Sequence, residues 1–286
     1  MNTVTHIGPI NTSSVAYQEI TTHVDKKHHI AWCYMHEATG PCFTTSLLEE
    51  LIHWTQSLRN QTVQADIRYH VVASQIPGIY NLGGDLKLFR SLIQQADRDG
   101  LLAYGKKCID ALYANIVHFN RPITTISLVQ GDALGGGFET ALSSDVLIAE
   151  KGTHMGFPEI LFNLFPGMGA FSLLSRKLDP KRAESMILSG NLYSAEELHA
   201  MGLVDILAEQ GDGEMAVYDY IRRENRARNG FQAVRQVRDA MNPISYEELL
   251  RIVEIWVEAA LKLEARDLRM MERLASRQGK VGARAA

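Results

Sequence analysis

The chain has 286 residues, of which 46% are apolar and 22% are charged, as in ordinary soluble globular proteins. A net charge of −4 does not indicate nucleic-acid binding, and no stretch approaches the roughly 20 apolar residues of a membrane span. Residues 1–14 are polar and lack the pattern of a signal peptide. Cys33, Cys42 and Cys108 are too few for a disulfide framework, and the histidines show no ligand spacing. We therefore expect a cytoplasmic protein without a metal site.

The first half of the chain alternates between strand and helix patterns. Residues 15–22, 29–35 and 67–74 predict strands, and residues 44–58 predict an amphipathic helix. A further short strand then leads into a turn at Gly83-Gly84. Residues 86–119 predict two helices with a break around Asp99-Gly100.

The second half continues this alternation and then changes character. Residues 123–129 and 145–149 predict strands, and helix-start signals follow near Phe171, Pro180 and Ala195. After Val204-Asp205 the strand signal stops. The last long helix carries an apolar stripe from Leu249 to Leu263, which favours packing onto the core. We predict an α/β core over residues 1–207 and a C-terminal helical region over residues 208–286.

Two glycine-rich turns follow strands, one at Gly83-Gly84 and one at residues 135–137. Glycine lets the backbone approach a ligand closely, and a helix N-terminus presents unpaired N–H groups to negative charge. The second turn leads into a helix with Glu139 in its first turn. The two turns predict a site in which two backbone amides hold one negatively charged oxygen.

Glu139 and Glu159 each lie among apolar or small neighbours. Such surroundings disfavour the ionised carboxylate and raise its pKa, which suits acid–base catalysis. Two amides would stabilise the enolate formed when a thioester loses its α-proton. Two carboxyl groups suit the addition or removal of water across a double bond, whereas one would suffice to move the double bond.

Motifs for other chemistry are missing. The chain has no Gly-x-Gly-x-x-Gly fingerprint, no phosphate-binding P-loop and no Gly-x-Ser-x-Gly elbow. Arg222, Arg223, Arg226 and Arg228 form a basic cluster. A solvated helix face is the favoured interpretation of this cluster, and docking of an acidic carrier protein is the alternative.

The segments GDALGGGFE (residues 131–139) and NLGGDL (residues 81–86) resemble the two oxyanion-hole motifs of the crotonase (enoyl-CoA hydratase/isomerase) superfamily. This resemblance implies a spiral core of ββα units followed by C-terminal helices. It also implies that the amides of Gly84 and Gly136 form the oxyanion hole and that Glu139 and Glu159 are the catalytic glutamates.

Within the superfamily, four segments resemble the diffusible signal factor synthases: YNLGGDL (80–86), GFPEILF (156–162), LFPGMGA (164–170) and EIWV (254–257). The resemblance implies that a 3-hydroxyacyl group on acyl carrier protein is dehydrated to a cis-2-enoyl thioester. The thioester is then hydrolysed to a cis-2-unsaturated, medium-chain quorum-sensing fatty acid of the cis-2-dodecenoic type. A housekeeping enoyl-CoA hydratase/isomerase and a non-catalytic crotonase-like binding module remain as alternatives.

The same resemblance makes Leu134, Met168, Trp256 and Leu274 candidates for an acyl-binding tunnel, although ordinary core packing explains them equally well. It implies no cofactor, because the substrate is carried on acyl carrier protein or coenzyme A. It also implies a trimer-based homo-oligomer and a membrane sensor kinase as a further partner, without membrane insertion of this chain.

Overall fold

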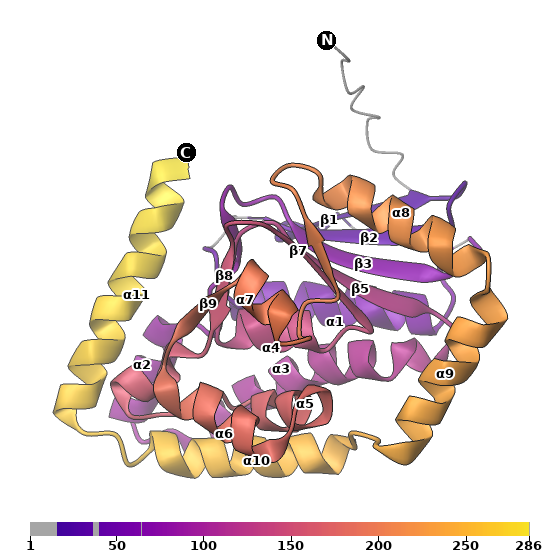
Figure 1. Ribbon diagram of the computed structural model, residues 1–286. Helices are drawn as coiled ribbons and strands as arrows, with labels where there is room; N and C mark the ends of the chain where they lie inside the picture. Colours follow the sequence, from indigo (N-terminus) through magenta and orange to yellow (C-terminus); the bar gives the residue numbers. More distant parts are fainter. Residues whose placement is uncertain (1–15, 37–39, 64, 286) are drawn as a thin grey trace.

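The computed structural model describes residues 16–36, 40–63 and 65–285. The predictions for residues 1–14, and for the first residue of the strand predicted at 15–22, lie outside this part of the chain. Two β-sheets lie among the helices, and the C-terminal helices α9, α10 and α11 run around the outside (Figure 1).

Three successive units each give one strand to a six-stranded sheet and the next strand to a four-stranded sheet. The sheet orders are β1-β2-β3-β5-β7-β10 and β4-β6-β8-β9. The strand pairs of the three units are β3 (Tyr69–Ser74) with β4 (Ile79–Asn81), β5 (Thr124–Val129) with β6 (Asp132–Leu134), and β7 (Val146–Glu150) with β8 (His154–Gly156). The predicted α/β core of ββα units is confirmed.

Helices follow each of these strand pairs. The first pair leads to α2 (Leu86–Gln94) and α3 (Arg98–Ile116), and the second leads to α4 (Gly136–Leu142). The third leads to the 3₁₀ helix η2 (Pro158–Phe162), α5 (Ala170–Lys177) and α6 (Pro180–Ser189). The remaining elements of the core are β1 (Ile20–Asp25), β2 (Ile30–Met35), α1 (Thr45–Arg59), η1 (His118–Asn120), β9 (Leu192–Ser194), α7 (Ala195–Ala200) and β10 (Ile206–Ala208).

Two predicted boundaries were wrong for local reasons. The strand predicted at residues 15–22 is β1, Ile20–Asp25, because Asp25 caps the turn by accepting from the backbone N–H of Lys27 and of His28, each at 3.0 Å. The helix break predicted at Asp99-Gly100 lies before Asp97. Asp97 is the N-cap of α3 and accepts from Gly100 N–H at 2.9 Å, so Gly100 lies inside the first turn.

The strand signal does not end at Asp205. Residues Ile206–Ala208 form β10, which pairs in parallel with β7. Three residues are too few to show a periodic pattern, so only the pairing partner reveals this strand. The predicted domain boundary at residue 207 therefore lies within β10.

The six-stranded sheet is covered on both faces. One face packs against α1, α3 and α4, and the other packs against α8 (Gly213–Asn225) through Val217, Tyr220 and Ile221. Every residue of β5 is buried, as expected of a parallel strand with both faces covered.

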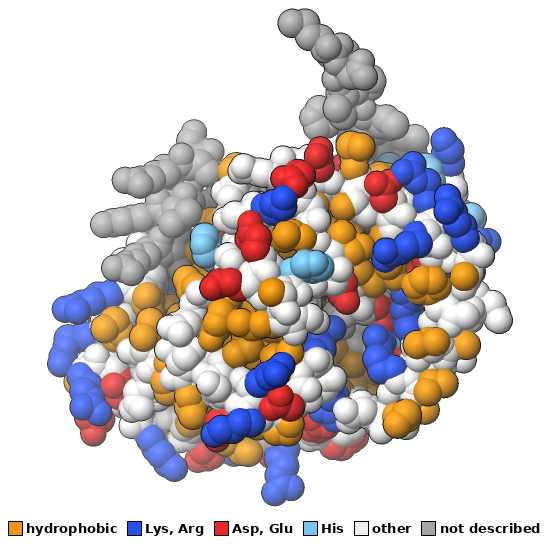
Figure 2. All heavy atoms as spheres, in the orientation of Figure 1, with side chains coloured by type: hydrophobic (Ala, Val, Ile, Leu, Met, Phe, Trp, Pro, Cys, Tyr) orange, Lys and Arg blue, Asp and Glu red, His pale blue; other side chains and the backbone are white. Residues whose placement is uncertain are grey.

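The other C-terminal helices are α9 (Arg228–Met241), α10 (Tyr246–Ala260) and α11 (Ala265–Ala285). The apolar stripe of α10 packs against α3, with Leu249, Val253 and Trp256 buried, so the predicted packing onto the core is confirmed. Helix α9 has no buried residue and leaves apolar side chains at the surface, visible at the right of Figure 2. No helix of the described residues has both the length and the apolar character needed to cross a bilayer.

A buried ion pair joins α8, α9 and β5. The fully buried carboxylate of Glu224 accepts from Arg235 Nη2 at 2.6 Å and from the Thr124 hydroxyl at 2.9 Å. Removing one partner of such a pair leaves the other charge buried without compensation.

We predict that Glu224→Ala lowers the free energy of unfolding by about 3 kcal/mol, measured by urea denaturation. On the same helix, Asp219 pairs with Arg222 in solvent, so Asp219→Ala is the matched control and should cost less than about 1 kcal/mol. Equal effects of the two substitutions would contradict the structural role of Glu224.

Candidate active site

The two glycine-rich turns lie side by side because β4 and β6 are parallel neighbours. A methyl group added to Gly136 would lie 3.7 Å from the backbone nitrogen of Gly84. Among the described residues, neither the Gly84 nor the Gly136 amide has a hydrogen-bond acceptor. Two free N–H donors from separate parts of the sequence therefore meet at one place.

Asn81 holds the first turn in the conformation that frees the Gly84 amide. Its buried side chain accepts from Gly83 N–H at 2.8 Å, and the Gly83 carbonyl accepts from Phe43 N–H at 2.7 Å. Gly83 has a φ of 88°, which an L side chain rarely adopts. With both groups of Gly83 engaged, the next amide is left for a ligand.

Glu139 lies in the first turn of α4 and is fully buried. Its Oε1 accepts from Met168 N–H at 2.9 Å and from Ala170 N–H at 2.8 Å. Its Oε2 is buried without a hydrogen-bond partner among the described residues. Burial raises the pKa of Glu139 to about 7, against the opposing effect of the backbone donors.

Glu159 lies in η2, and its Oε2 is likewise buried without a partner in the described chain. Burial, together with the negative charge of Glu139, raises the pKa of Glu159 to about 8. Near neutral pH the two carboxyl groups therefore hold about one proton between them. Such a pair can donate a proton and accept one in the same reaction.

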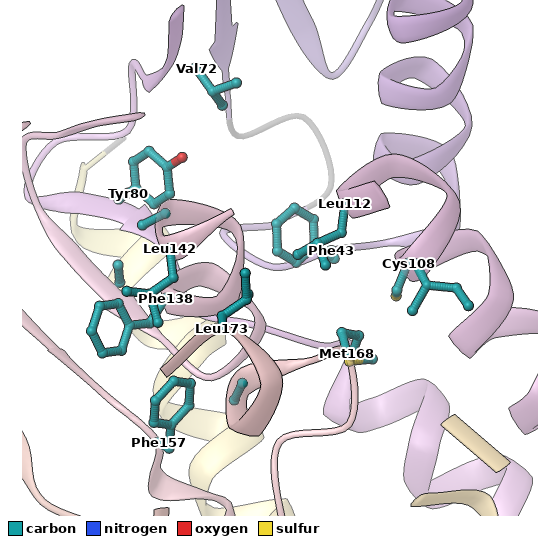
Figure 3. Close-up of a cluster of buried hydrophobic side chains, with 14 of the residues drawn as sticks. Phe43, Val72, Tyr80, Cys108, Leu112, Phe138, Leu142, Phe157, Met168 and Leu173 are labelled. Atoms are coloured by element: carbon teal, nitrogen blue, oxygen red, sulfur yellow. The ribbon is translucent and has the colours of Figure 1, made fainter. Parts of the chain in front are cut away.

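The segments that carry the two glutamates are packed together. Phe138, beside Glu139, stacks on Phe157 with ring centroids 5.0 Å apart (Figure 3). The Gly135 N–H donates to the Gly156 carbonyl at 2.9 Å. These contacts fix α4 against η2, so each glutamate is held by its own element.

Gly135 makes room for the Glu159 carboxyl group. A methyl group at position 135 would lie 2.2 Å from Glu159 Oε1, and the φ of Gly135 is 53°. The first glycine of the triple therefore serves Glu159, whereas the second supplies a free amide. The sequence predicted the amide role of Gly136, but not the role of Gly135 in making room for Glu159.

Both free amides and both glutamates line one cavity of about 490 Å³, called the outer cavity below. All four acyl-tunnel candidates line it as well: Leu134 from β6, Met168 from the loop before α5, Trp256 from α10 and Leu274 from α11. Its remaining walls are largely apolar, and its volume lies in the range of small-molecule sites, roughly 300–1,000 Å³. The outer cavity suits an apolar ligand with one polar, reactive group.

The basic cluster predicted at the end of α8 lies elsewhere. In Figure 1 this end of α8 is at the right of the molecule, whereas α2, β9 and α11, which contribute lining residues to the outer cavity, lie toward the left. Arg222 pairs with Asp219, and Arg223 stacks over Tyr220. These contacts favour the solvated-face interpretation. Within the described residues, no group of three or more acidic, histidine or cysteine side chains is placed to hold a metal ion.

Chemically, the site can stabilise an oxyanion and move two protons. The free amides would hold an enolate or a tetrahedral oxyanion, while the carboxyl pair exchanges protons with the adjacent carbons and oxygens. Sequence reasoning missed the backbone donors of Met168 and Ala170, because any residue type can supply an N–H. The side-chain role of Asn81 had a signal, since asparagine two residues before a glycine favours such a turn.

Comparisons with known proteins all point to the same family. The enoyl-CoA hydratase/isomerase family model matches residues 27–267. Mitochondrial methylglutaconyl-CoA hydratase of Mus musculus is 30% identical over 152 residues, which is 53% of this chain and 46% of that protein. Mitochondrial enoyl-CoA hydratase domain-containing protein 2 of Homo sapiens is 30% identical over 185 residues, 65% of this chain and 59% of that protein. The matches thus span about half the length of these relatives.

Solved structures share the fold. Enoyl-CoA hydratase from Bacillus halodurans superimposes with a TM-score of 0.76 at 18% identity, covering 90% of this chain and 100% of that one. The structure of Pseudomonas aeruginosa DspI superimposes with a TM-score of 0.69 at 24% identity, covering 82% of this chain and 86% of that one.

We predict that Gly135→Ala lowers kcat/KM by about 10²-fold, because the methyl group displaces the Glu159 carboxyl group from its position. Gly152 also has a positive φ, 82°, but no atom lies near its missing side chain. Gly152→Ala therefore also places an alanine at a positive φ, but without the clash, and should retain activity. Equal activity of the two variants would contradict this role of Gly135.

We also predict that Glu159→Gln stabilises the protein at alkaline pH. The pKa is raised from 4.5 to about 8 on folding, so the stability of the wild type falls as the pH rises through that window. At about pH 9 the variant should be more stable by about 1 kcal/mol or more, and at about pH 4 the gain should vanish.

Urea denaturation at both pH values measures this difference. Glu196→Gln on α7 changes an exposed glutamate, and should alter the unfolding free energy by less than about 0.5 kcal/mol at either pH. A Glu159→Gln variant with no stability gain at the higher pH would show that burial does not raise this pKa.

Proposed function

The chain belongs to the enoyl-CoA hydratase/isomerase family, and within it we propose a dehydratase that is also a thioesterase. Its substrate is a 3-hydroxyacyl group on acyl carrier protein. Its product is a free cis-2-unsaturated, medium-chain fatty acid of the cis-2-dodecenoic type, used as a quorum-sensing signal. The observation that carries the proposal is a pair of carboxyl groups, each with one buried and unpaired oxygen, that lines an apolar cavity together with two free amides.

Dehydration uses both carboxyl groups at once. With the thioester carbonyl oxygen on the amides of Gly84 and Gly136, the ionised carboxylate removes the α-proton and the amides stabilise the enolate. The protonated carboxyl group then gives its proton to the 3-hydroxyl, which leaves as water as the double bond forms. Each step moves one proton, so Glu139 and Glu159 end with one proton between them, as they began.

Hydrolysis of the thioester can use the same groups. A carboxylate takes a proton from water as the water oxygen attacks the carbonyl carbon, and the amides hold the tetrahedral oxyanion. The carbon–sulfur bond then breaks, and the proton passes to the thiol of the carrier. The released water of the first step and the consumed water of the second balance, so the net reaction yields the unsaturated acid and the free carrier thiol.

An enoyl-CoA hydratase is the second candidate, because the curated relatives named above include a hydratase of a CoA thioester. The same carboxyl pair serves that reaction. A non-catalytic binding module is disfavoured by the cost of burying Glu139 and Glu159 with one oxygen each unpaired, roughly 1–3 kcal/mol per group. A module that only binds an apolar ligand gains nothing from this arrangement.

The proposal extends to assembly. The exposed apolar residues of α9, Val234, Val237 and Met241, lie on one side of a helix with no buried residue. A trimer-based homo-oligomer could cover this surface. The acyl carrier protein and a membrane sensor kinase stand as proposed partners without an assigned surface.

We predict that the purified protein converts 3-hydroxydodecanoyl carrier protein to free cis-2-dodecenoic acid, detected by mass spectrometry. Glu139→Ala and Glu159→Ala should each lower this activity by about 10² or more, the usual contribution of a positioned acid or base. Glu196→Ala, which changes an exposed glutamate on α7, is the control and should be fully active.

The products separate the candidates. A trans-enoyl thioester without free acid would rule out the dehydratase–thioesterase, and rapid hydration of crotonyl-CoA would favour the hydratase. Full activity in either catalytic-site variant would remove that glutamate from the mechanism. Unchanged signal production in cells by the double variant would support a binding module.

A further inference from the structure

A second cavity, the inner chamber, begins at the same amides and extends into the core. It has a volume of about 50 Å³, and Gly84, Gly136 and Met168 line both it and the outer cavity. Neither the proposed dehydration nor the proposed hydrolysis involves a group of the protein that lies deeper in this chamber.

The inner chamber is long and narrow. On α4 it is lined by Gly136, Thr140 and Ser143, which recur at helical spacing along one face. Seven residues at 1.5 Å each give the chamber a length of about 10 Å along this helix. One face of α1, one face of α3 and residues of β2 and β3 form most of the other walls, which are mostly apolar.

The inner chamber meets the outer cavity at Gly84, Gly136 and Met168, and of these only Met168 has a flexible side chain. Figure 3 shows Phe43 and Leu112 together, with Cys108 to one side and Met168 below them, and all four line the chamber. Methionine is unbranched and adopts several shapes at low cost, so Met168 can admit a chain without movement of the backbone. The backbone N–H of the same residue holds Glu139, so the opening adjoins the reacting carbons.

The far end of the chamber is polar. Asn115 Nδ2 donates to the Ser143 hydroxyl at 2.9 Å, which places Asn115 at the end of α4 away from Gly136. His70 and Asn115 are both buried and line the chamber. Neither His70 Nδ1 nor Asn115 Oδ1 has a partner within ordinary hydrogen-bond limits in the described chain, although the Asn115 side chain lies close enough to raise the pKa of His70 against the effect of burial. His70 Nε2 accepts from Trp54 Nε1 at 3.1 Å, so the ring proton lies on Nδ1. A donor and an acceptor at the end of an apolar channel are unfavourable neighbours for a methyl group.

We propose that the inner chamber receives the far end of the substrate's acyl chain, and that His70 and Asn115 set the longest chain that fits. This inference rests on the proposed acyl-thioester substrate. The carrier arm and the first carbons lie in the outer cavity, because the inner chamber, at about 50 Å³, has roughly a tenth of the volume of the outer cavity, at about 490 Å³. The inner chamber thus limits the length of the acyl chain that the protein can bind, and it takes no part in the chemical steps.

The test is the chain-length profile of wild-type protein and of Ala111→Phe. Ala111 lines the inner chamber from α3, and a phenyl ring there would fill it. Each methylene group buried contributes about fourfold to kcat/KM, so excluding two should cost about tenfold or more. On 3-hydroxyacyl carrier proteins lengthened in two-carbon steps, the variant should lose this factor on the longest good substrate and less than about twofold on the shortest.

Two comparisons make the result specific. Ala103→Phe places the same ring on the solvent-exposed face of α3 and should keep the wild-type profile. Leu274→Trp narrows the outer cavity only. A folded Ala111→Phe variant with an unchanged profile, or with equal losses at every length, would overturn the proposal. So would a length limit that moves with Leu274→Trp but not with Ala111→Phe.

Calorimetric binding of straight-chain fatty acids of increasing length separates this inference from the proposed function. One outcome is that the wild-type protein binds the long acids at least about tenfold more tightly than Ala111→Phe does, yet turns over no thioester. This outcome would support the role of the inner chamber and rule out the dehydratase–thioesterase. If the wild-type protein turns over the thioester but both proteins bind the long acids equally, the dehydratase–thioesterase stands and the role of the inner chamber is ruled out. If Ala111→Phe does not fold, as judged by circular dichroism, Ala111→Leu provides the same comparison with a smaller side chain.

Discussion

The buried carboxyl group of Glu139 constrains much of the structure around it. A carboxylate removed from water must be compensated by hydrogen bonds or take up a proton, and here both happen in part. Backbone donors at Met168 and Ala170 stabilise the charge, while burial holds the pKa near neutrality. The loop before α5 therefore has to close over α4, and the cavity wall that includes Met168 follows from that closure.

The carboxyl group of Glu159 lies close enough to Glu139 for their titrations to be linked. The charge of Glu139 contributes to the raised pKa of Glu159, so the pair holds one proton near neutral pH. This coupling depends on the packing of α4 against η2 through Phe138 and Phe157. Glu139 Oε2 and Glu159 Oε2 are buried without a hydrogen-bond partner among the described residues, which lowers the stability of the fold. A bound ligand could supply the missing hydrogen-bond partners.

The repeated ββα unit explains why residues distant in the sequence meet at one site. Each unit places a strand of the smaller sheet next to the equivalent strand of the preceding unit, so the turn after β4 lies against the turn after β6. The C-terminal helices then close the cavity from outside, with Trp256 from α10 and Leu274 from α11. The two free amides and Glu139 thus come from the repeats, whereas the C-terminal helices added after them complete the wall of the outer cavity.

The sequence by itself determined the alternation of strands and helices, the two glycine-rich turns and the two glutamates among apolar neighbours. Those features depend on residues that are close together in the chain. Glycine permits a backbone conformation that other residues avoid, the spacing of apolar residues reports which face of an element is buried, and flanking residues set the polarity around a carboxyl group. It misplaced the end of β1 and the break before α3, and it missed β10, where a capping carboxylate or a distant partner strand decides.

Only the tertiary structure decided which groups act together. The free amides of Gly84 and Gly136, the space that Gly135 leaves for Glu159 and the inner chamber depend on distances between segments that no spacing along the chain records. Backbone donors are equally hidden, because every residue except proline carries an N–H and its direction is set by the fold.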